Sequence, residues 1–210
     1  EGNHKVDFTK VKQHTGHIIE EIDAQEMLEN EVIVFPEITF IENIVPGTID
    51  WPSANELCIM RNEIRNELIA NLVEKHGLPT LILVKNIEHG EILNKLIPNS
   101  IFVSGCKSSE DRQEAIKNFD TGEITTLIAT NIFNEGISIN IIRVLIIASG
   151  GKSKIETTQK LGRGLRKDEG KEKVLVFDFY DLGNKFCQRH SESRMKIYKK
   201  VGFPVNVIQE

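Results

Sequence analysis

Four positions between residues 159 and 166 form the pattern with the clearest chemical potential in this chain. They are Gln159, Gly162, Arg163 and Arg166. On a helix their spacing of i, i+3, i+4 and i+7 places all four on one face. Two planar, permanently charged guanidinium groups suit phosphate oxygens, and a glycine lets a phosphate or a backbone approach closely. Each glycine costs ~1 kcal/mol of helix propensity, which favours a phosphate-binding face over its alternative, an ordinary basic surface.

A second pattern follows a buried apolar run. Thr130 stands at the expected carboxyl end of that strand, where a hydroxyl can meet a phosphate. Glu135-Gly136 indicates a turn that exposes backbone, and the short polar Ser138 follows it. Taken alone, this is also what an ordinary strand-to-loop junction looks like. Two weaker polar patterns follow other expected strands, at residues 84–89 and 103–105.

Short apolar runs from residue 80 onward predict the scaffold that positions these patterns. The runs lie at residues 80–84, 101–103, 125–129, 144–148 and 174–177. They are continuous rather than alternating, which is typical of parallel strands covered on both faces. Capping-box pairs at Ser108 with Asp111 and at Ser153 with Glu156 predict helices between them. The order predicts an α/β fold with a doubly wound, mostly parallel sheet, helices on both faces, and ligands at the carboxyl ends of the strands.

The two ends of the chain differ from this core. The elements expected before it are a strand at 17–22, a short helix at 24–30, a strand at 31–44 and a helix from Ser53 to about Lys75. Pro36 favours a sheet edge for the strand at 31–44, and Gly77 marks the end of the helix. We expect residues 1–79 to be a connector with edge elements packed on the core, residues 80–182 to be the core domain, and residues 183–210 to be a helical extension.

Composition and charge limit the classes of protein. Of 210 residues 40% are hydrophobic, which is enough for a sizeable core, and no apolar run approaches the ~18 residues of a membrane span. Three cysteines lie far apart with no C-x-x-C pair, so we expect neither a disulfide framework nor a structural metal site. With no signal peptide, a cytoplasmic protein is expected, in the host cytoplasm if it is viral. The first residue is not Met, which suggests an excised or processed piece.

The net charge of −5 is unevenly distributed. Residues 1–78 carry −9, whereas residues 152–200 carry +7. Such asymmetry is expected when one face meets a polyanion, and chance clustering on a solvated surface is the alternative. Aromatic residues make up only 6%, so phosphate tracking is favoured over base stacking.

Residues 149–153 contain Gly-Lys-Ser between a strand and a helix, as a phosphate-cradling P-loop would. That motif needs a first glycine five positions before Gly151, and Ile146 stands there. The loop is too short to wrap a triphosphate. A nucleotide phosphotransferase that uses Gly151, Lys152 and Ser153 is therefore the weakest alternative.

In this order the patterns resemble the C-terminal RecA-like domain of superfamily 2 helicases, closest to phage UvsW-type DNA helicases and their XPB-like relatives. The matching segments are residues 85–89 for motif IV, 130–138 for motif V and 159–166 for motif VI. The resemblance implies that Arg163 and Arg166 reach ATP phosphates across an interdomain cleft, with Arg166 as the arginine finger. It implies that Gln159 positions the γ-phosphate or the attacking water.

The resemblance also implies two further groups of site residues. Those expected on the nucleotide side are Glu135, Gly136, Ser138 and Gly162. Those expected against nucleic acid are Lys85, Asn86, His89, Ser104, Gly105, Thr130 and Asn131. No metal ligand is expected among them.

The sequence lacks a Walker A motif and a D-E-x-[DH] magnesium motif. The family carries both in a first RecA-like domain, so ATP and Mg²⁺ are expected to bind mainly there and this chain alone to be inactive. The function expected is the C-terminal motor domain of an ATP-dependent DNA helicase that unwinds or branch-migrates DNA in repair or recombination. Its partners would be branched or junction DNA and its own N-terminal RecA-like domain, with no membrane and a monomeric fragment. A non-catalytic nucleic-acid-binding module that uses residues 152–200 is the main alternative.

Overall fold

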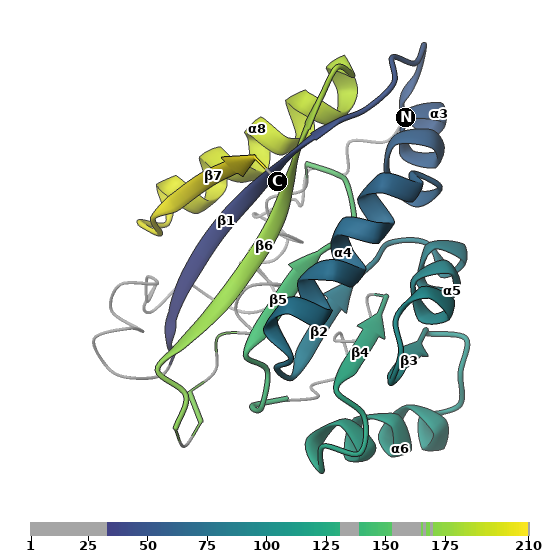
Figure 1. The fold of residues 1–210 in the computed structure, drawn as a ribbon, viewed down its shortest axis with the longest axis vertical. Helices are drawn as coiled ribbons and strands as arrows, with labels where there is room; N and C mark the ends of the chain where they lie inside the picture. Colours follow the sequence, from purple (N-terminus) through teal and green to yellow (C-terminus); the bar gives the residue numbers. More distant parts are fainter. Residues whose placement is uncertain (1–32, 131–138, 153–164, 166, 169, 210) are drawn as a thin grey trace, which may run out of the picture.

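The computed structural model describes residues 33–130, 139–152, 165, 167–168 and 170–209. Within these residues seven strands form one sheet in the order β3-β4-β2-β5-β6-β1-β7, and every neighbouring pair is parallel (Figure 1). The strands are β1 Phe35–Ile44, β2 Thr80–Leu83, β3 Ser100–Val103, β4 Thr126–Ala129, β5 Val144–Ile147, β6 Lys173–Leu182 and β7 Val205–Gln209. The predicted doubly wound parallel sheet is confirmed.

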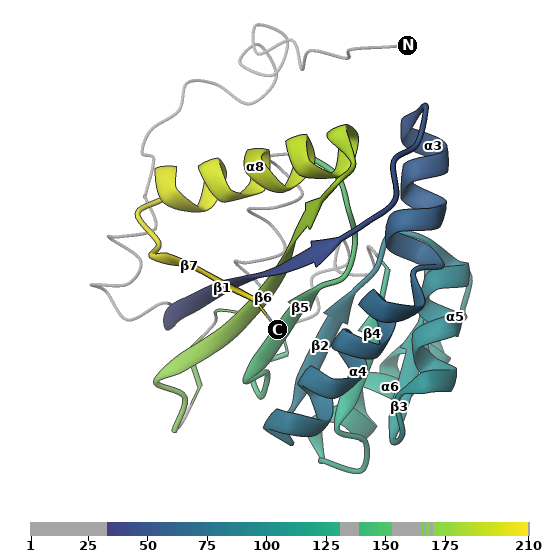
Figure 2. The same ribbon diagram turned by 45° about the horizontal axis from the view of Figure 1, so that its top comes forward.

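Helices cover both faces of this sheet (Figures 1 and 2). They are α3 Trp51–Ala54, the π-helical turn η1 Asn55–Met60, α4 Glu63–His76, α5 Ile87–Leu96, α6 Ser109–Asp120 and α8 Lys185–Lys200. Leu81 and Leu83 of β2 belong to the core cluster that includes residues of α6 and α8, whereas Ile82 belongs to the cluster that includes residues of α4 and α5. Alternate side chains of one strand thus enter two separate cores.

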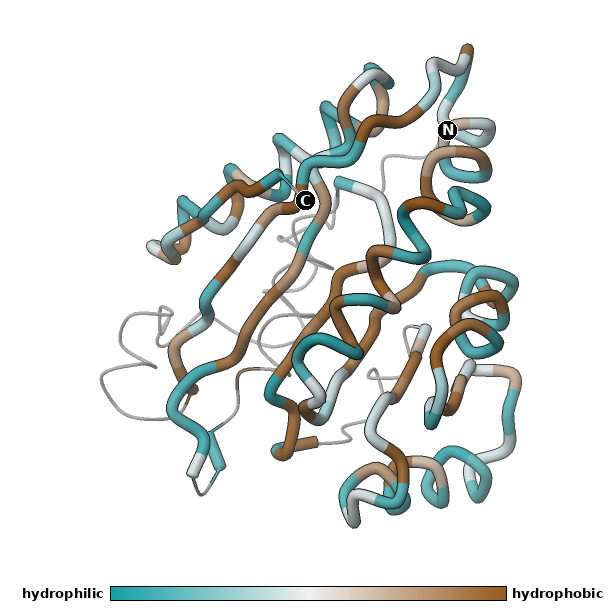
Figure 3. The backbone as a smooth tube through the Cα atoms, viewed as in Figure 1, coloured by the Kyte–Doolittle hydropathy of each residue, from teal (hydrophilic) through white to brown (hydrophobic). Residues whose placement is uncertain are grey.

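Strands β2, β4 and β5 are buried at all four of their residues. Figure 3 shows the matching concentration of apolar residues in the central strands, with polar residues mainly in helices and loops. The continuous apolar runs of the sequence therefore mark strands that are covered on both faces.

The predicted helix from Ser53 to Lys75 is interrupted in the structure. Its first turn begins earlier, because the Asp50 carboxylate accepts a hydrogen bond from the Ser53 amide at 2.8 Å and caps α3. After η1 the helix breaks, and the side chain of Asn62 caps α4 by accepting from the Arg65 amide at 2.9 Å. Gly77 ends α4 in the left-handed conformation, as predicted.

The prediction of an edge strand at 31–44 is wrong, because β1 lies between β6 and β7. Pro36 pairs with Val174 of β6, and pairing with β7 starts only at Ile38. The missing N–H of Pro36 therefore lies outside the stretch that is paired on both sides. The edge is formed by β7, which follows the predicted C-terminal helix at Val205.

Several other predictions fall outside the described residues: the strand at 17–22, the helix at 24–30 and the helix opened by Ser153. The Ser108 cap is confirmed, because its hydroxyl accepts from the Asp111 amide at 3.0 Å. None of the helices in the described ranges is both long and apolar enough to cross a bilayer.

Candidate nucleic-acid interface

The carboxyl ends of four neighbouring strands, β3, β4, β2 and β5, meet at one edge of the sheet. Polar or glycine residues follow each of them: Ser104 and Gly105 after β3, Thr130 after β4, Lys85 and Asn86 after β2, and Gly151 and Lys152 after β5. The structure therefore brings five of the sequence-predicted nucleic-acid residues to this edge.

Lys85 is an exposed cation in this row, two residues before α5. Asn86 is the N-cap residue of α5, yet its side chain makes no capping hydrogen bond; its Nδ2 donates instead to the Met60 sulfur at 3.5 Å. The amide groups at the start of α5 point toward the same edge, where the positive end of the helix dipole favours an anion. Lys85 and the start of α5 together suit a phosphate.

Ser104 follows β3 and Thr130 follows β4, and a backbone hydrogen bond connects the two strand ends. The Thr130 amide donates to the Val103 carbonyl at 3.3 Å, and the Lys107 amide donates to the Ser104 carbonyl at 3.1 Å to close a turn. Ser104 is buried, Thr130 is half-buried and Gly105 is exposed. The turn thus presents the backbone of Gly105, rather than a long side chain, to the edge.

The prediction for His89 is corrected by its burial. His89 is 2% exposed, and its Nε2 lies 3.0 Å from the Oδ1 of Asn66 on α4. Burial and, second, the charge of Arg65 lower its pKa to about 3, so its ring is neutral. His89 packs α5 against α4 and does not face a ligand at the edge.

The remaining predicted site residues lie outside the described residues: Asn131, Glu135, Gly136, Ser138, Gln159, Gly162, Arg163 and Arg166. The chain enters the first of these segments from the end of β4 at Thr130, and the second just after Lys152. Beyond the second segment, Leu165 is buried and its carbonyl accepts from the Val34 amide at 2.7 Å.

A pocket of about 700 Å³ opens at the same edge, between α3, the first turns of α8 and the loops after β2 and β5. Its described lining consists of Trp51, Lys85, Gly151, Lys152, Phe186, Arg189 and His190. We call this the Trp51 pocket. The charge excess over residues 152–200 pointed to two of its cations, but no sequence signal marked Trp51 or Phe186.

The loop at residues 148–152, which forms one wall of the Trp51 pocket, is held by two buried arginines. Arg65 of α4 donates from Nη1 to the Ala148 carbonyl at 2.7 Å, and Arg194 of α8 donates from Nη1 to the Gly151 carbonyl at 2.8 Å. Asp178 of β6 receives Nε and Nη2 of Arg194 at 2.9 Å, and Asp181 lies 3.4 Å from Nε of Arg65. Two buried arginines, each facing an aspartate, therefore hold this loop from inside the protein.

The neighbouring aspartates do not offset the burial of the two arginines to the same extent. Burial alone would lower the pKa of Arg194, but the attraction and hydrogen bonds of Asp178 raise it above its usual range. Burial lowers the pKa of Arg65, and Asp181 offsets only part of that effect. Arg65 also lies over the Phe179 ring, 4.0 Å from its centroid.

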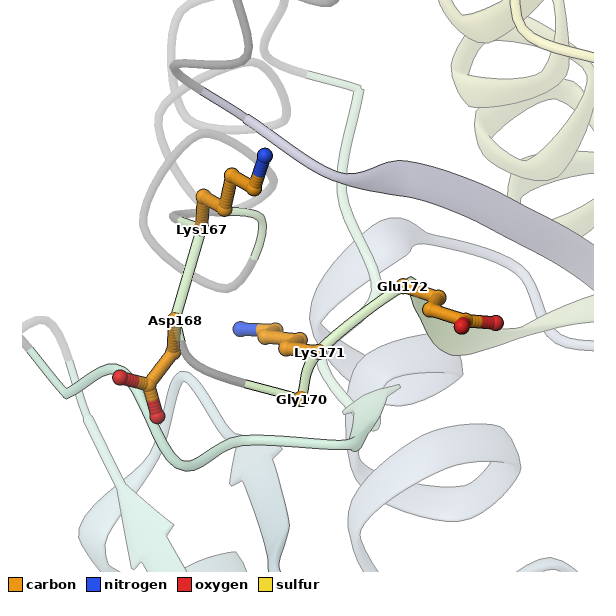
Figure 4. Close-up of a pocket in the computed structure, with 5 residues that line it drawn as sticks. All are labelled: Lys167, Asp168, Gly170, Lys171 and Glu172. Atoms are coloured by element: carbon orange, nitrogen blue, oxygen red, sulfur yellow. The ribbon is translucent and has the colours of Figure 1, made fainter.

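A second pocket, of about 520 Å³, lies before β6 and so at the opposite edge of the sheet (Figure 4). Its described lining is Lys167, Asp168, Gly170, Lys171 and Glu172. Lys171 is buried, its Nζ donates to the Asn140 carbonyl at 3.1 Å, and burial lowers its pKa to about 8. Figure 4 shows the Lys171 and Glu172 side chains pointing away from each other. This pocket is remote from the strand ends that carry the predicted site.

Within the described ranges, no group of three or more His, Cys, Asp or Glu residues could hold a metal ion. We therefore assign no metal ligand to these residues.

In comparison with known families, residues 63–168 match the model described as the helicase conserved C-terminal domain. That segment is about half of the chain. It contains β2 to β5 and the predicted motifs IV, V and VI.

Related proteins include helicases of viruses. The chain is 30% identical over 205 residues to protein 161L of Invertebrate iridescent virus 6, whose name places it among helicases. It is 31% identical over 125 residues to the ATP-dependent DNA helicase uvsW of Enterobacteria phage T4. These matches cover 88% and 56% of this chain but only 44% and 25% of the two relatives. The chain thus spans less than half of either protein.

A crystal structure of T4 UvsW has the same fold. It superposes with a TM-score of 0.66 at 20% identity, over 83% of this chain and 42% of that one.

Proposed function

The chain belongs to the helicase conserved C-terminal domain family, as a RecA-like domain of superfamily 2 near the UvsW branch, and from this we propose that it is the second motor domain of an ATP-dependent DNA helicase. In this proposal it tracks the phosphate backbone of DNA at the strand-end edge and supplies arginines to a nucleotide held by a first RecA-like domain. DNA, rather than RNA, is proposed because the phage relative is named a DNA helicase.

The observation that carries the proposal is the row of groups along the ends of β3, β4, β2 and β5. Lys85 and the start of α5 suit a phosphate by charge and dipole, and the turn at Gly105 leaves backbone accessible. Backbone contacts of this kind position a strand without reading its sequence, which is what a moving helicase needs.

The catalytic part of the proposal concerns residues in 131–138 and 153–166, two segments that the chain enters after Thr130 and Lys152 at this edge. ATP, when bound between two RecA-like domains, would supply the phosphoanhydride bond whose hydrolysis drives movement. Arg166 would stabilise the charge that develops on the phosphoryl oxygens, with Arg163 beside it and Gln159 positioning the attacking water. Glu135, Gly136, Ser138 and Gly162 would couple this nucleotide side to the contacts of Thr130 and Asn131 with DNA.

The test uses a parent protein that contains both RecA-like domains. Arg166→Ala should lower DNA-stimulated ATP hydrolysis by about 10³-fold or more and leave DNA affinity within twofold, because an arginine finger acts on the transition state. Arg61→Ala is the matched control, since Arg61 is exposed and pairs with Glu88 at 2.6 Å. Near-normal turnover by Arg166→Ala would exclude it as the finger.

ATP hydrolysis by the 210-residue chain alone separates this proposal from the phosphotransferase alternative. We expect no turnover, with or without forked DNA at low salt. Turnover that disappears in Lys152→Ala would instead favour a phosphate site in the chain itself. The packing of Gly150 argues against such a site: a Cβ there would lie 2.1 Å from Ile59 and 3.0 Å from Trp51, so this backbone is enclosed by side chains.

A further inference from the structure

The Trp51 pocket combines aromatic rings with three cations. Lys85, Lys152 and Arg189 are exposed, and within the described ranges no carboxylate forms an ion pair with any of them. They come from three separate elements: the loop after β2, the loop after β5 and α8. Three like charges that converge repel one another, so a bound anion would stabilise this arrangement.

The aromatic side of the pocket is held rigidly. The rings of Trp51 and His190 meet edge to face, with their centroids 4.1 Å apart and an angle of 61° between their planes. A Cβ on Gly150 would come within 3.0 Å of the far edge of the Trp51 ring, so the ring also packs closely on the loop after β5. Trp51 and Phe186 both remain half-buried, which leaves part of each ring accessible at the pocket.

His190, which also lines the pocket, has a buried nitrogen whose hydrogen bond is not supplied by the described residues. It is 9% exposed, and its Nδ1 is buried without a hydrogen-bond partner in the part of the chain that the structure describes. Burial, followed by the charges of Arg194, Lys152, Arg189 and Lys85, lowers its pKa to about 4. The ring is therefore neutral at pH 7, and the described part of the chain leaves the hydrogen-bonding capacity of its Nδ1 unused.

We propose that the Trp51 pocket binds one nucleotide unit of a single strand, with the base against Trp51 and Phe186 and the phosphate among Lys85, Lys152 and Arg189. This inference rests on the proposed function, because Lys85 belongs to both sites. It extends the phosphate track to α3 and α8, which lie outside the residues that match the family model.

The chemistry of the pocket selects this ligand. Its volume of about 700 Å³ lies within the range of ordinary small-ligand sites and so admits one nucleotide unit. Bases of an intact duplex are stacked on their neighbours and cannot reach the rings, whereas an unpaired base can. A cationic groove beside aromatic rings is the usual way in which proteins hold single strands without a sequence preference.

The single tryptophan of the chain gives a direct readout. The 210-residue chain is titrated at low salt with a fluorescein-labelled oligothymidylate of about 12 nucleotides, within the range of ordinary single-strand sites. Anisotropy reports binding, and a parallel titration with unlabelled strand follows Trp51 fluorescence. We expect both signals to saturate together, with Trp51 quenched. A strand of the same length that carries abasic sites should bind with little quenching, because it keeps the phosphates and lacks the bases.

Two variants and a control test whether the strand binds in the Trp51 pocket. Arg189→Ala should weaken binding about fivefold to tenfold through one lost charge-assisted contact, and Phe186→Leu should do so through lost stacking. Lys200→Ala should change binding less than twofold, because Lys200 is an exposed cation on the same helix about 16 Å farther along its axis. Arg189 is exposed, so Arg189→Ala decides the test even if Phe186→Leu fails to fold.

The outcomes separate this inference from the proposed function. Binding without a change in Trp51 fluorescence, together with wild-type affinity in Arg189→Ala, would overturn the pocket and leave the strand-end track intact. Equal quenching by the normal and abasic strands would overturn the base contact. Absence of binding in both readouts would overturn the pocket and the proposed DNA interface together.

Discussion

Two sets of cations, one buried and one exposed, meet at the loop of residues 148–152, and they differ in their counter-charges. Inside the protein, Arg194 and Arg65 are buried and face Asp178 and Asp181. At the surface, the three cations of the Trp51 pocket have no ion-pair partner among the described residues. The first set holds the loop through its carbonyl groups, and the second presents positive charge to the pocket.

The difference follows from the desolvation cost of a cation, which is large in the interior and small at the surface. A buried guanidinium without a carboxylate would carry a large desolvation cost, so the inner set is paired. An exposed cation has little such cost and stays available for an external anion. The pairing of a cation, rather than its charge alone, therefore separates a structural arginine from a candidate ligand-binding one.

The largest expected effect comes from the inner set. Arg194→Met should lower the free energy of unfolding by about 3–5 kcal/mol, because it leaves the Asp178 carboxylate buried without its main counter-charge. Urea unfolding followed by far-ultraviolet circular dichroism measures this loss. A double variant with Asp178→Asn should recover part of it. Equal midpoints for the single and double variants would contradict an unpaired charge as the cause.

Arg65→Met should cost less, about 1–3 kcal/mol by the same measurement. Nε and Nη2 of Arg65 make no hydrogen bond within the described ranges, so the substitution removes poorly satisfied groups. Asp181 also keeps a hydrogen bond from Asn43 Nδ2 at 3.2 Å. A loss as large as that of Arg194→Met would show that the number of hydrogen bonds does not rank these two arginines.

The outer set should affect binding and leave stability nearly unchanged. Lys152→Ala should shift the urea midpoint little and reduce the slope of log affinity against log salt by about 1, as expected for one lost phosphate contact. Affinities for oligothymidylate at several salt concentrations give this slope. An unchanged slope would remove Lys152 from the anion site.

The charges of both sets act on His190, and the change expected there is a shift in its pKa. Its pKa is about 4 in the folded chain and near 6.5 when unfolded, so the unfolded state binds more protons between these values. Its contribution to stability is therefore complete above pH 6.5 and is lost as the pH falls through 4. His89, with a pKa of about 3, acts in the same direction.

Proton NMR titration of the imidazole signals measures the pKa values of His190 and His89. In Arg189→Ala the pKa of His190 should rise, because one repelling charge is removed, whereas that of His89 should stay unchanged. Unchanged values for both residues would mean that the outer cations do not act on His190.

Much of the fold was predictable because its signals are local. The continuous apolar runs marked β2 to β6, Ser108 and Gly77 marked helix ends, and Lys85 and Thr130 marked strand ends. The failures are non-local. The sequence around Pro36 indicated an edge, but the strand order placed β7 outside β1. His89 followed a predicted strand like a site residue, yet Asn66 and Arg65 of α4 enclose it.

The sequence by itself therefore determined the α/β class, the ends of the central strands and the family, since burial patterns, caps and motifs are written in neighbouring residues. The tertiary structure alone decided the order of the outer strands, the pairing of Arg65 and Arg194, and the meeting of Trp51, Lys85, Lys152 and Arg189 in one pocket. Those four residues are each more than thirty positions apart along the chain. Only the packing of α3 and α8 at the ends of β2 and β5 brings them together, and no local propensity specifies that packing.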